Sequence, residues 1–166
     1  MSYRATRYFV NVDGASRGNP GPAAAAMVVQ DESGKVLLTK SKSLGITTNN
    51  VAEWSALEGA IKTLGYLAGR SRGKIEAVIR SDSELIVKQF NGEFRIRDPE
   101  LKAIAARVRK YLKDHPALKI SVVHVPREEN RLADQEANKA LAKEIQETNI
   151  CEGGSHQDER KNRSRP

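Results

Sequence analysis

Four acidic residues stand at the edges of strongly patterned segments of this 166-residue chain: Asp13, Glu53, Asp82 and Asp134. Two of them end alternating apolar runs, and the other two lie near the start of amphipathic segments. Carboxylates that gather in one place repel one another unless a cation lies between them. If the fold brings these four acids together, the sequence therefore predicts a cation site.

The stretch NVDGASRGNPGP at residues 11–22 places the first acid, Asp13, before a turn rich in glycine, asparagine and proline. On its own this stretch has two interpretations, a hairpin turn or a phosphate-binding glycine loop. The second is disfavoured because no lysine followed by serine or threonine comes after the glycines, and the next segment is typical of a strand. Whether Asp13 is more than a turn residue depends on its distant partners.

Alternating apolar residues predict the strands that carry two of the acids. Residues 8–13 alternate, and the segments 23–31 and 35–44 follow them after short turns, which is typical of three strands in an antiparallel meander. Residues 74–82 form a further strand, separated from the meander by a helix over 49–69. That helix allows the fourth strand to return parallel to the first, so the acids at their ends meet at one edge of the sheet.

The remaining acids are expected near the N-terminal ends of helices. Asn49 or Asn50 caps the first long helix, and Glu53 lies in its first turn. The later segments are a short helix over 83–91, a helix over 99–115 capped by Asp98, a strand over 118–125, and a helix over 131–146 capped by Asn130 with Asp134 in its first turn. A first-turn acid by itself often only complements the helix dipole. Four acids that reach one edge by separate routes favour a site.

The chemistry of such a site follows from its ligands. Carboxylate oxygens without histidine or cysteine suit a hard divalent ion such as Mg²⁺ or Mn²⁺, which shares its coordination shell with water and substrate phosphate. Two such ions can activate an attacking water and stabilise the leaving oxygen at phosphorus. Hydrolysis of a phosphodiester is therefore the leading reaction class.

Composition limits the setting of this chemistry. The net charge of +7 indicates a polyanionic partner. Cys151 is the only cysteine, which excludes an intrachain disulfide and favours a reducing compartment, so we expect a cytoplasmic protein. No long apolar stretch predicts a membrane segment, and a monomer is the simplest expectation. Residues 1–147 are expected to form the catalytic domain and 148–166 a disordered polar tail.

Four motifs carry a resemblance to a known family. The stretches DGASRGNPGPAAAA, TTNNVAEWSALEGAI, SDSELIV and NRLADQEANKAL, within residues 8–143, resemble the motifs of ribonuclease H type I in their order and spacing. The resemblance implies an α/β fold of the ribonuclease H type, a five-stranded mixed sheet with three antiparallel and two parallel strands, flanked by helices. It also implies that Asp13, Glu53, Asp82 and Asp134 are catalytic metal ligands.

The family's activity is the second implication. Its members cut the RNA strand of RNA–DNA hybrids and leave 5′-phosphate and 3′-hydroxyl ends. The resemblance therefore implies two Mg²⁺ ions, with Mn²⁺ as a substitute, and leaves double-stranded RNA open as a further substrate. The matching substrate-binding positions are Asn19, Thr48, Asn49, Asn50 and Ser83. Amides can bond the 2′-hydroxyls and base edges of the minor groove, and the two hydroxyl side chains are candidates for phosphate.

The sequence departs from the better-known family pattern before the last acid. Many members carry a histidine-bearing loop there, whereas this chain has the short stretch VPREEN. We expect His124 to be a strand residue, and Arg127 to take over the role of the loop histidine, with Glu128 as the alternative.

A second departure concerns the grip on substrate. The short FNGEFRIRDPELK connection leaves no room for the basic handle of many members. Candidate contacts on the general positive surface are Lys88, Arg95, Arg97 and Lys102. In addition, Glu84 stands where relatives often carry glutamine, and an acid there is expected to repel phosphate.

Two other functions compete with this interpretation. A nucleic-acid-binding module that has lost its chemistry has no need for all four acids, yet all four are present. A related DNA nuclease on the same fold has no need for the GNPG and TTNN elements. Both features favour the hybrid-cutting enzyme.

Overall fold

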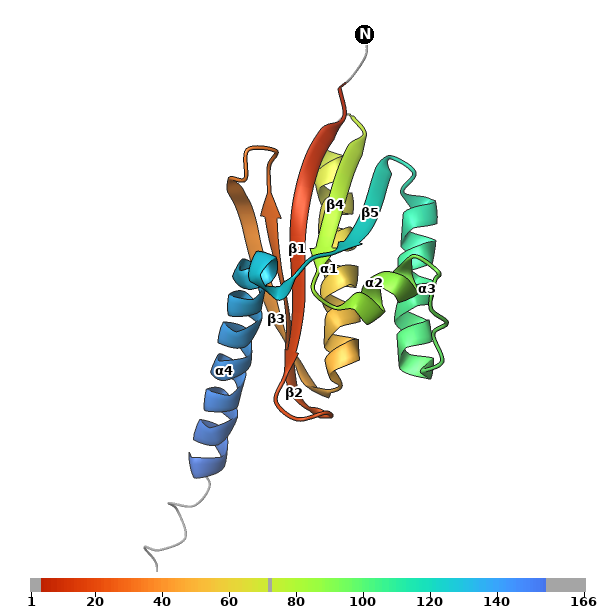
Figure 1. The fold of residues 1–166 in the computed structure, drawn as a ribbon. Helices are drawn as coiled ribbons and strands as arrows, with labels where there is room; N and C mark the ends of the chain where they lie inside the picture. Colours follow the sequence, from red (N-terminus) through yellow and green to blue (C-terminus); the bar gives the residue numbers. More distant parts are fainter. Residues whose placement is uncertain (1–3, 72, 155–166) are drawn as a thin grey trace, which may run out of the picture.

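A mixed sheet of five strands forms the centre of the fold, and helices cover both of its faces (Figure 1). The structure is a computed structural model and describes residues 4–71 and 73–154. Its elements in chain order are β1 (Thr6–Ser16), β2 (Gly21–Gln30), β3 (Val36–Thr47), α1 (Asn49–Arg70), β4 (Ile75–Ser81), α2 (Glu84–Phe90), α3 (Pro99–Asp114), β5 (Leu118–His124), the 3₁₀ turn η1 (Arg127–Asn130) and α4 (Arg131–Gly154).

The strand order β3-β2-β1-β4-β5 confirms the predicted sheet. β1, β2 and β3 pair antiparallel as a meander, whereas β4 lies parallel to β1 and to β5. α1 carries the chain from the end of β3 back to the start of β4, so β4 runs parallel to β3 and to β1.

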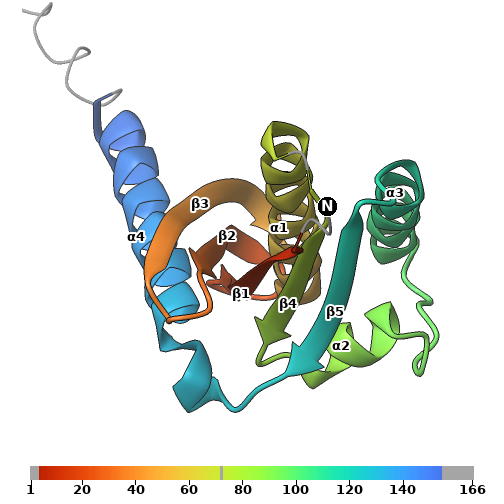
Figure 2. The same cartoon turned by 90° about the horizontal axis from the view of Figure 1, so that it is seen from above.

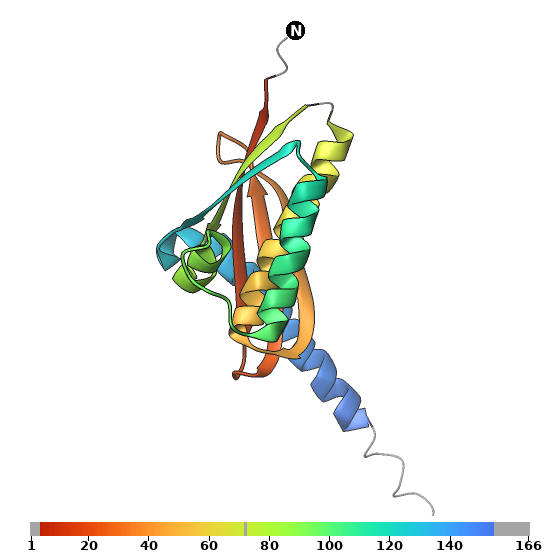
Figure 3. The ribbon, with the colours of Figure 1, turned by 90° about the vertical axis from the view of Figure 1, so that its right-hand side faces the viewer.

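The helices form two layers around this sheet. α1 and α3 lie side by side over one face, and α4 packs on β1, β2 and β3 from the other (Figures 2 and 3). β2 therefore lies between two helices, and its residues Ala23 to Val29 are all buried. Small alanines in its first half let both helices approach the sheet closely.

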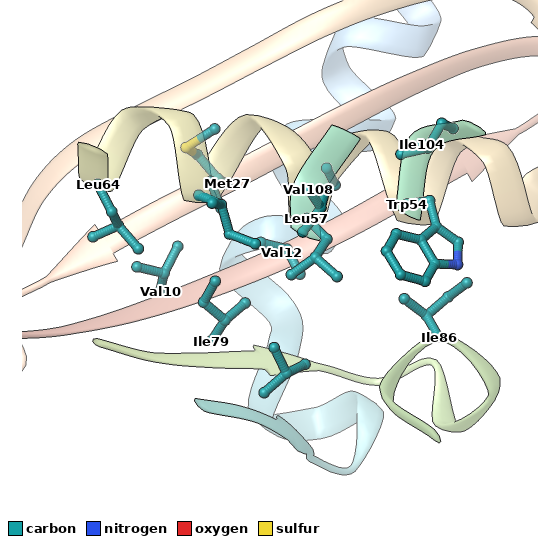
Figure 4. Close-up of a cluster of buried hydrophobic side chains, with 14 of the residues drawn as sticks. Val10, Val12, Met27, Trp54, Leu57, Leu64, Ile79, Ile86, Ile104 and Val108 are labelled. Atoms are coloured by element: carbon teal, nitrogen blue, oxygen red, sulfur yellow. The ribbon is translucent and has the colours of Figure 1, made fainter. Parts of the chain in front are cut away.

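The main core lies between α1 and the sheet (Figure 4). Leu64 of α1 lies beside Val10 of β1 at one end of this core, and Trp54 of α1 lies beside Ile86 of α2 at the other. Apolar residues recur at three- and four-residue intervals along α1, so one face of the helix meets the sheet over its length. This packing fixes α1 against β1, which matters because each carries one of the acids.

Thr48, not Asn49 or Asn50, is the N-cap of α1. Its hydroxyl accepts a hydrogen bond from the backbone N–H of Val51 at 3.2 Å. The predicted cap was therefore wrong by one residue, because threonine caps a helix as asparagine does and comes first in the chain. Glu53 consequently lies just beyond the first turn, where its side chain turns toward the sheet instead of the helix end.

The last helix is longer than the sequence predicted. α4 continues to Gly154, whereas the expected polar tail began at residue 148. No helix-breaking residue occurs until Gly153 and Gly154, so the helix extends past the point where its apolar pattern stops. The prediction of disorder over 155–166 lies outside the described residues. In the described part of the chain, none of the helices has the length and apolar character that crossing a membrane requires.

Candidate active site

Asp13 and Asp82 lie at the same edge of the sheet. Asp13 was predicted to end its strand, but β1 continues to Ser16 because it stays paired with β2. Its parallel pairing with β4 stops earlier, at Asn11 and Arg80. Asp13 therefore lies just beyond the end of β4, and Asp82 follows the last residue of that strand.

Gly14 brings the third acid, Glu53, to this edge. A Cβ atom on Gly14 would lie 2.4 Å from the carbonyl carbon of Ala52 and 2.4 Å from the nitrogen of Glu53. Only glycine fits where β1 touches the backbone of α1, since any side chain would push the helix away. The contact places Glu53 beside Asp13.

The structure gathers Asp13, Glu53 and Asp82 into one cluster. One carboxylate oxygen of each lies within 4.8 Å of the others. Asp13 and Glu53 are only 4% and 5% exposed, while Asp82 is half-buried. The predicted convergence of these acids is therefore seen, from β1, α1 and the end of β4.

Burial and mutual repulsion oppose ionisation of the cluster. Burial, followed by the charge of Asp82 and contact with Asp134, raises the pKa of Asp13 to about 7. Burial and the charges of Asp13 and Asp82 raise the pKa of Glu53 well above its usual value. Burial also raises the pKa of Asp82, and the positive charge of Arg127 opposes that rise. A cation bound among these groups would reverse these effects.

The donor set fits a divalent metal ion. Oε2 of Glu53 is buried and has no hydrogen-bond partner among the described residues. A buried acceptor without a donor is costly, and a bound cation would satisfy it. Carboxylate oxygens are the ligands that Mg²⁺ and Mn²⁺ prefer.

Asp134 and Arg127 form the exposed rim of the same cleft. Asp134 lies in the first turn of α4, as predicted, and its Oδ1 is 3.9 Å from Nη2 of Arg127. Asn138, one turn further along α4, donates to the Asp134 carboxylate at 3.2 Å. The three side chains face the buried acids across a cleft of about 420 Å³.

A larger groove elsewhere offers no comparable ligand set. It has a volume of about 670 Å³ and lies between α1, β2 and β3. Its acid, Glu58, is held by a two-point ion pair with Arg107 and by Lys62 at 3.8 Å. The carboxylate cleft is smaller, but its acids Asp13 and Asp82 have no such ion pair among the described residues.

Two of the five predicted substrate contacts are joined at the lip of this cleft. Asn19 Oδ1 accepts from the backbone N–H of Asn49 at 3.1 Å, and Asn49 lines the cleft. Thr48 is used as the cap of α1, and Ser83 caps α2 through the N–H of Ile86. Asn50 is half-buried next to Asn49 and does not line the carboxylate cleft.

The structure distinguishes the candidates for the loop histidine. Arg127 lines the carboxylate cleft, whereas Glu128 lines a separate hollow with Arg80 and Arg131. His124 is the last residue of β5 and pairs with Ser81, as expected for a strand residue. Arg127 is thus the candidate that faces the acids.

Glu84 forms an ion pair with Lys88. Lys88 Nζ lies 2.7 Å from Glu84 Oε1, which lowers the pKa of Glu84, and it also lies over the ring of Phe94. The expected repulsion of phosphate by Glu84 is therefore offset by Lys88. Among the other basic candidates, Arg95 and Lys102 share a groove of about 570 Å³ with Arg109, and Arg97 is exposed nearby.

Three asparagines near the site were missed or misassigned from the sequence. Asn130 was expected to cap α4, but its side chain bonds β1 instead. Its partner Asn11 had no assigned role, although a buried asparagine within an apolar strand is itself a signal. Asn138 follows Asp134 by four residues, the spacing at which helix side chains meet.

Comparison with known proteins agrees with this geometry. Residues 11–140 match the family model described as reverse transcriptase-like. Over 138 residues the chain is 38% identical to ribonuclease HI of Halobacterium salinarum, an alignment that covers 83% of this chain and 66% of that protein. The crystal structure of LC11-RNase H1 in complex with an RNA/DNA hybrid aligns with a TM-score of 0.78 and 37% identity, over 83% of this chain and 99% of that one. The chain belongs to the type 1 ribonuclease H family.

The ribonuclease H relatives differ in total length. The crystal structure of RNase H1 from the same halophilic archaeon aligns with a TM-score of 0.72 and 36% identity, over 82% of this chain and 98% of that one. A bifunctional protein of Mycobacterium tuberculosis is 34% identical over 140 residues, but this chain covers only 35% of it. The ribonuclease H chain described here thus spans two thirds or less of the length of these curated relatives.

Proposed function

We propose that this protein is a metal-dependent endonuclease that hydrolyses the RNA strand of RNA–DNA hybrids, leaving 5′-phosphate and 3′-hydroxyl ends. The observation that carries the proposal is the cluster of Asp13, Glu53 and Asp82, with a buried Glu53 oxygen that lacks a partner. Membership of the type 1 ribonuclease H family supports it, as does the likeness to LC11-RNase H1, which was solved with an RNA/DNA hybrid.

The four acids are proposed to hold two Mg²⁺ ions, for which Mn²⁺ can substitute. Such ions lower the pKa of an attacking water and stabilise the leaving oxygen. Asp13 and Glu53 supply the buried side of the site, and Asp82 and Asp134 the side open to substrate. Because the pKa values of Asp13 and Glu53 are raised, ion binding must release protons from them.

Arg127 is proposed to act on the phosphate at the open side. A guanidinium stays charged at neutral pH, so it acts through charge and hydrogen bonds rather than as a proton donor. Its side chain is 78% exposed and its contact with Asp134 is long, so it is free to leave the carboxylate. That freedom suits a residue that helps the cut phosphate leave.

Substrate recognition is proposed to use the lip formed by Asn19 and Asn49, together with the neighbouring Asn50, because amides can bond 2′-hydroxyls in the minor groove. Thr48 and Ser83 keep their O–H donors for phosphate, because the helix caps use these hydroxyls as acceptors. The basic candidates for contacts with the phosphates of the hybrid are Lys88, Arg95, Arg97 and Lys102.

We further propose that the protein acts as a monomer in the cytoplasm. The alternative function, a binding module or a DNA nuclease without hybrid specificity, is less well supported. A module that only binds has no use for a buried cluster whose ionisation opposes folding. A DNA nuclease does not need the asparagine lip.

One assay separates these functions. End-labelled RNA–DNA hybrid, duplex RNA, duplex DNA and DNA with a single embedded ribonucleotide are incubated with Mg²⁺, Mn²⁺ or EDTA. Cutting of the hybrid's RNA strand, with metal and with 3′-hydroxyl products, is expected. Binding without cutting, or cutting of the DNA strand, would support the alternative.

A further inference from the structure

The short segment between β5 and α4 is anchored at both ends beside a proposed metal ligand. At its start, the N–H of Val125 donates to the carbonyl of Ser81 at 2.9 Å, one residue before Asp82. At its end, Nδ2 of Asn130 donates to the carbonyl of Val12 at 2.9 Å, one residue before Asp13. The segment therefore spans the ends of β4 and β1.

The anchor at Asn130 is a buried pair of amides. Asn130 has no exposed surface, and its Oδ1 accepts from Nδ2 of Asn11 at 3.0 Å. The same Asn11 nitrogen donates to the carbonyl of Glu129 at 3.0 Å. We call Asn11 and Asn130 the amide clamp. Its three bonds join β1 to the junction of η1 and α4.

The position of the clamp decides what it can control. Arg127 lies three residues before Asn130 on η1, and Asp134 lies four residues after it on α4. Asn11 and Asp13 share one face of β1, since strand side chains alternate. A shift of the junction would move Arg127 and Asp134 relative to Asp13.

General packing does not explain these residues. Asparagine is depleted from strands, and an apolar residue at either position would fill the space without the bonds. Amides add direction: each bond has a fixed donor and acceptor, so the junction has one position on β1. The buried pair therefore fixes the position of the start of α4 relative to β1.

We propose that Asn11 and Asn130 are positioning residues that set the place of Asp134 and Arg127 against Asp13, Glu53 and Asp82. The proposal rests on the proposed function, because it concerns the geometry of that same metal site. It gives the amides no contact with substrate or with the reacting atoms.

The test uses Asn130→Ala, Asn11→Ala and the double variant. Mn²⁺ affinity is measured by titration calorimetry, and kcat and KM on an RNA–DNA hybrid. We expect each single change to lower Mn²⁺ affinity and kcat by about ten- to a hundredfold, with KM nearly constant. Because both residues belong to one unit, the double variant should lose little more than Asn130→Ala alone.

The matched control is Gln89→Leu, which removes another buried side-chain bond, the one from Trp54 Nε1 to Gln89 Oε1 at 2.9 Å. It should lower the melting temperature by a similar amount yet leave Mn²⁺ affinity and kcat within about twofold.

Three results would overturn the proposal. In the first, both clamp variants fold and match the control in metal affinity and kcat. In the second, KM rises while kcat is kept. In the third, both clamp variants fail to fold, which would make the pair a folding determinant only. If the unmodified protein binds Mn²⁺ but cuts no hybrid, the proposed function fails, while the metal titrations still decide this proposal.

Discussion

The two sides of the carboxylate site are held in place by different means. On the buried side, Asp13 and Glu53 are fixed because Gly14 lets β1 touch the backbone of α1. On the rim, the side chains of Asp134 and Arg127 are 29% and 78% exposed, and a few side-chain hydrogen bonds join their segment to β1. The core therefore sets the buried geometry, while the rim geometry depends on single side chains. Substitutions on the two sides should have different effects.

The largest difference is expected between Asp13→Asn and Asp134→Asn. The first removes a buried carboxylate that is proposed to bind the metal and that nothing can replace, so Mg²⁺-dependent cleavage of hybrid should fall by at least about a thousandfold. The second changes a partly exposed carboxylate, also a proposed ligand, whose place water can take, so a loss of about ten- to a hundredfold is expected. Rates under saturating substrate measure both. Equal losses would mean that the two sides are not distinct.

The buried side should also make metal-free stability depend on pH. The pKa of Asp13 rises from 3.8 in the unfolded chain to about 7 in the fold, so between these values the folded state holds a proton that the unfolded state has released. Stability is therefore fully present below about pH 4 and is lost as pH rises to about 7, by at most about 4 kcal/mol for this group.

Urea unfolding in EDTA at several pH values, with Asp13→Asn as the control, isolates this effect. The variant should lose less stability across the window, and saturating Mg²⁺ should offset the loss in the unmodified protein. Identical pH profiles for the two proteins would show that ionisation of Asp13 does not cause the loss of stability.

On the rim, Arg127→Ala should slow multiple-turnover cleavage by about tenfold and single-turnover cleavage by less. The reason is that the exposed Arg127 is proposed to act on the leaving phosphate, after the bond has been cut. Its long contact with Asp134 adds little stability, so the melting temperature should hardly change. The matched variant is Glu128→Ala on the same turn, which lines a separate hollow. A similar slowing in both variants would remove the assignment to Arg127.

The smallest effects are expected away from both sides. Arg95→Ala and Lys102→Ala should weaken hybrid binding about two- to fivefold and lower the salt dependence by about one unit each, as expected for loss of a phosphate contact. Lys110, on the same helix as Lys102 but not lining that groove, provides the control. An unchanged salt slope would exclude this groove as a contact.

The sequence predicted the cluster of three acids better than the rim. Asp13, Glu53 and Asp82 follow from strand alternation, helix period and the right-handed crossover, which are properties of the whole pattern. The amide clamp does not, because a bond between Asn11 and Asn130 depends on how η1 turns, and no periodic signal fixes a short 3₁₀ turn. For the same reason the predicted caps of α1 and α4 were wrong. Several neighbouring residues can cap a helix, and the path of the backbone decides that Thr48 caps α1 and that Asn130 bonds β1 instead.

The central claim, that the buried carboxylates hold a divalent metal ion, is tested most directly by titrating Mn²⁺ into the metal-free protein at pH 6.5. Calorimetry in two buffers of different ionisation enthalpy counts the protons released. We expect binding with release of protons, since Asp13 with a pKa of about 7 and Glu53 with a pKa well above its usual value must both ionise, and no such binding in Asp13→Asn. Absence of binding to the unmodified protein, or equal binding to the variant, would contradict the account.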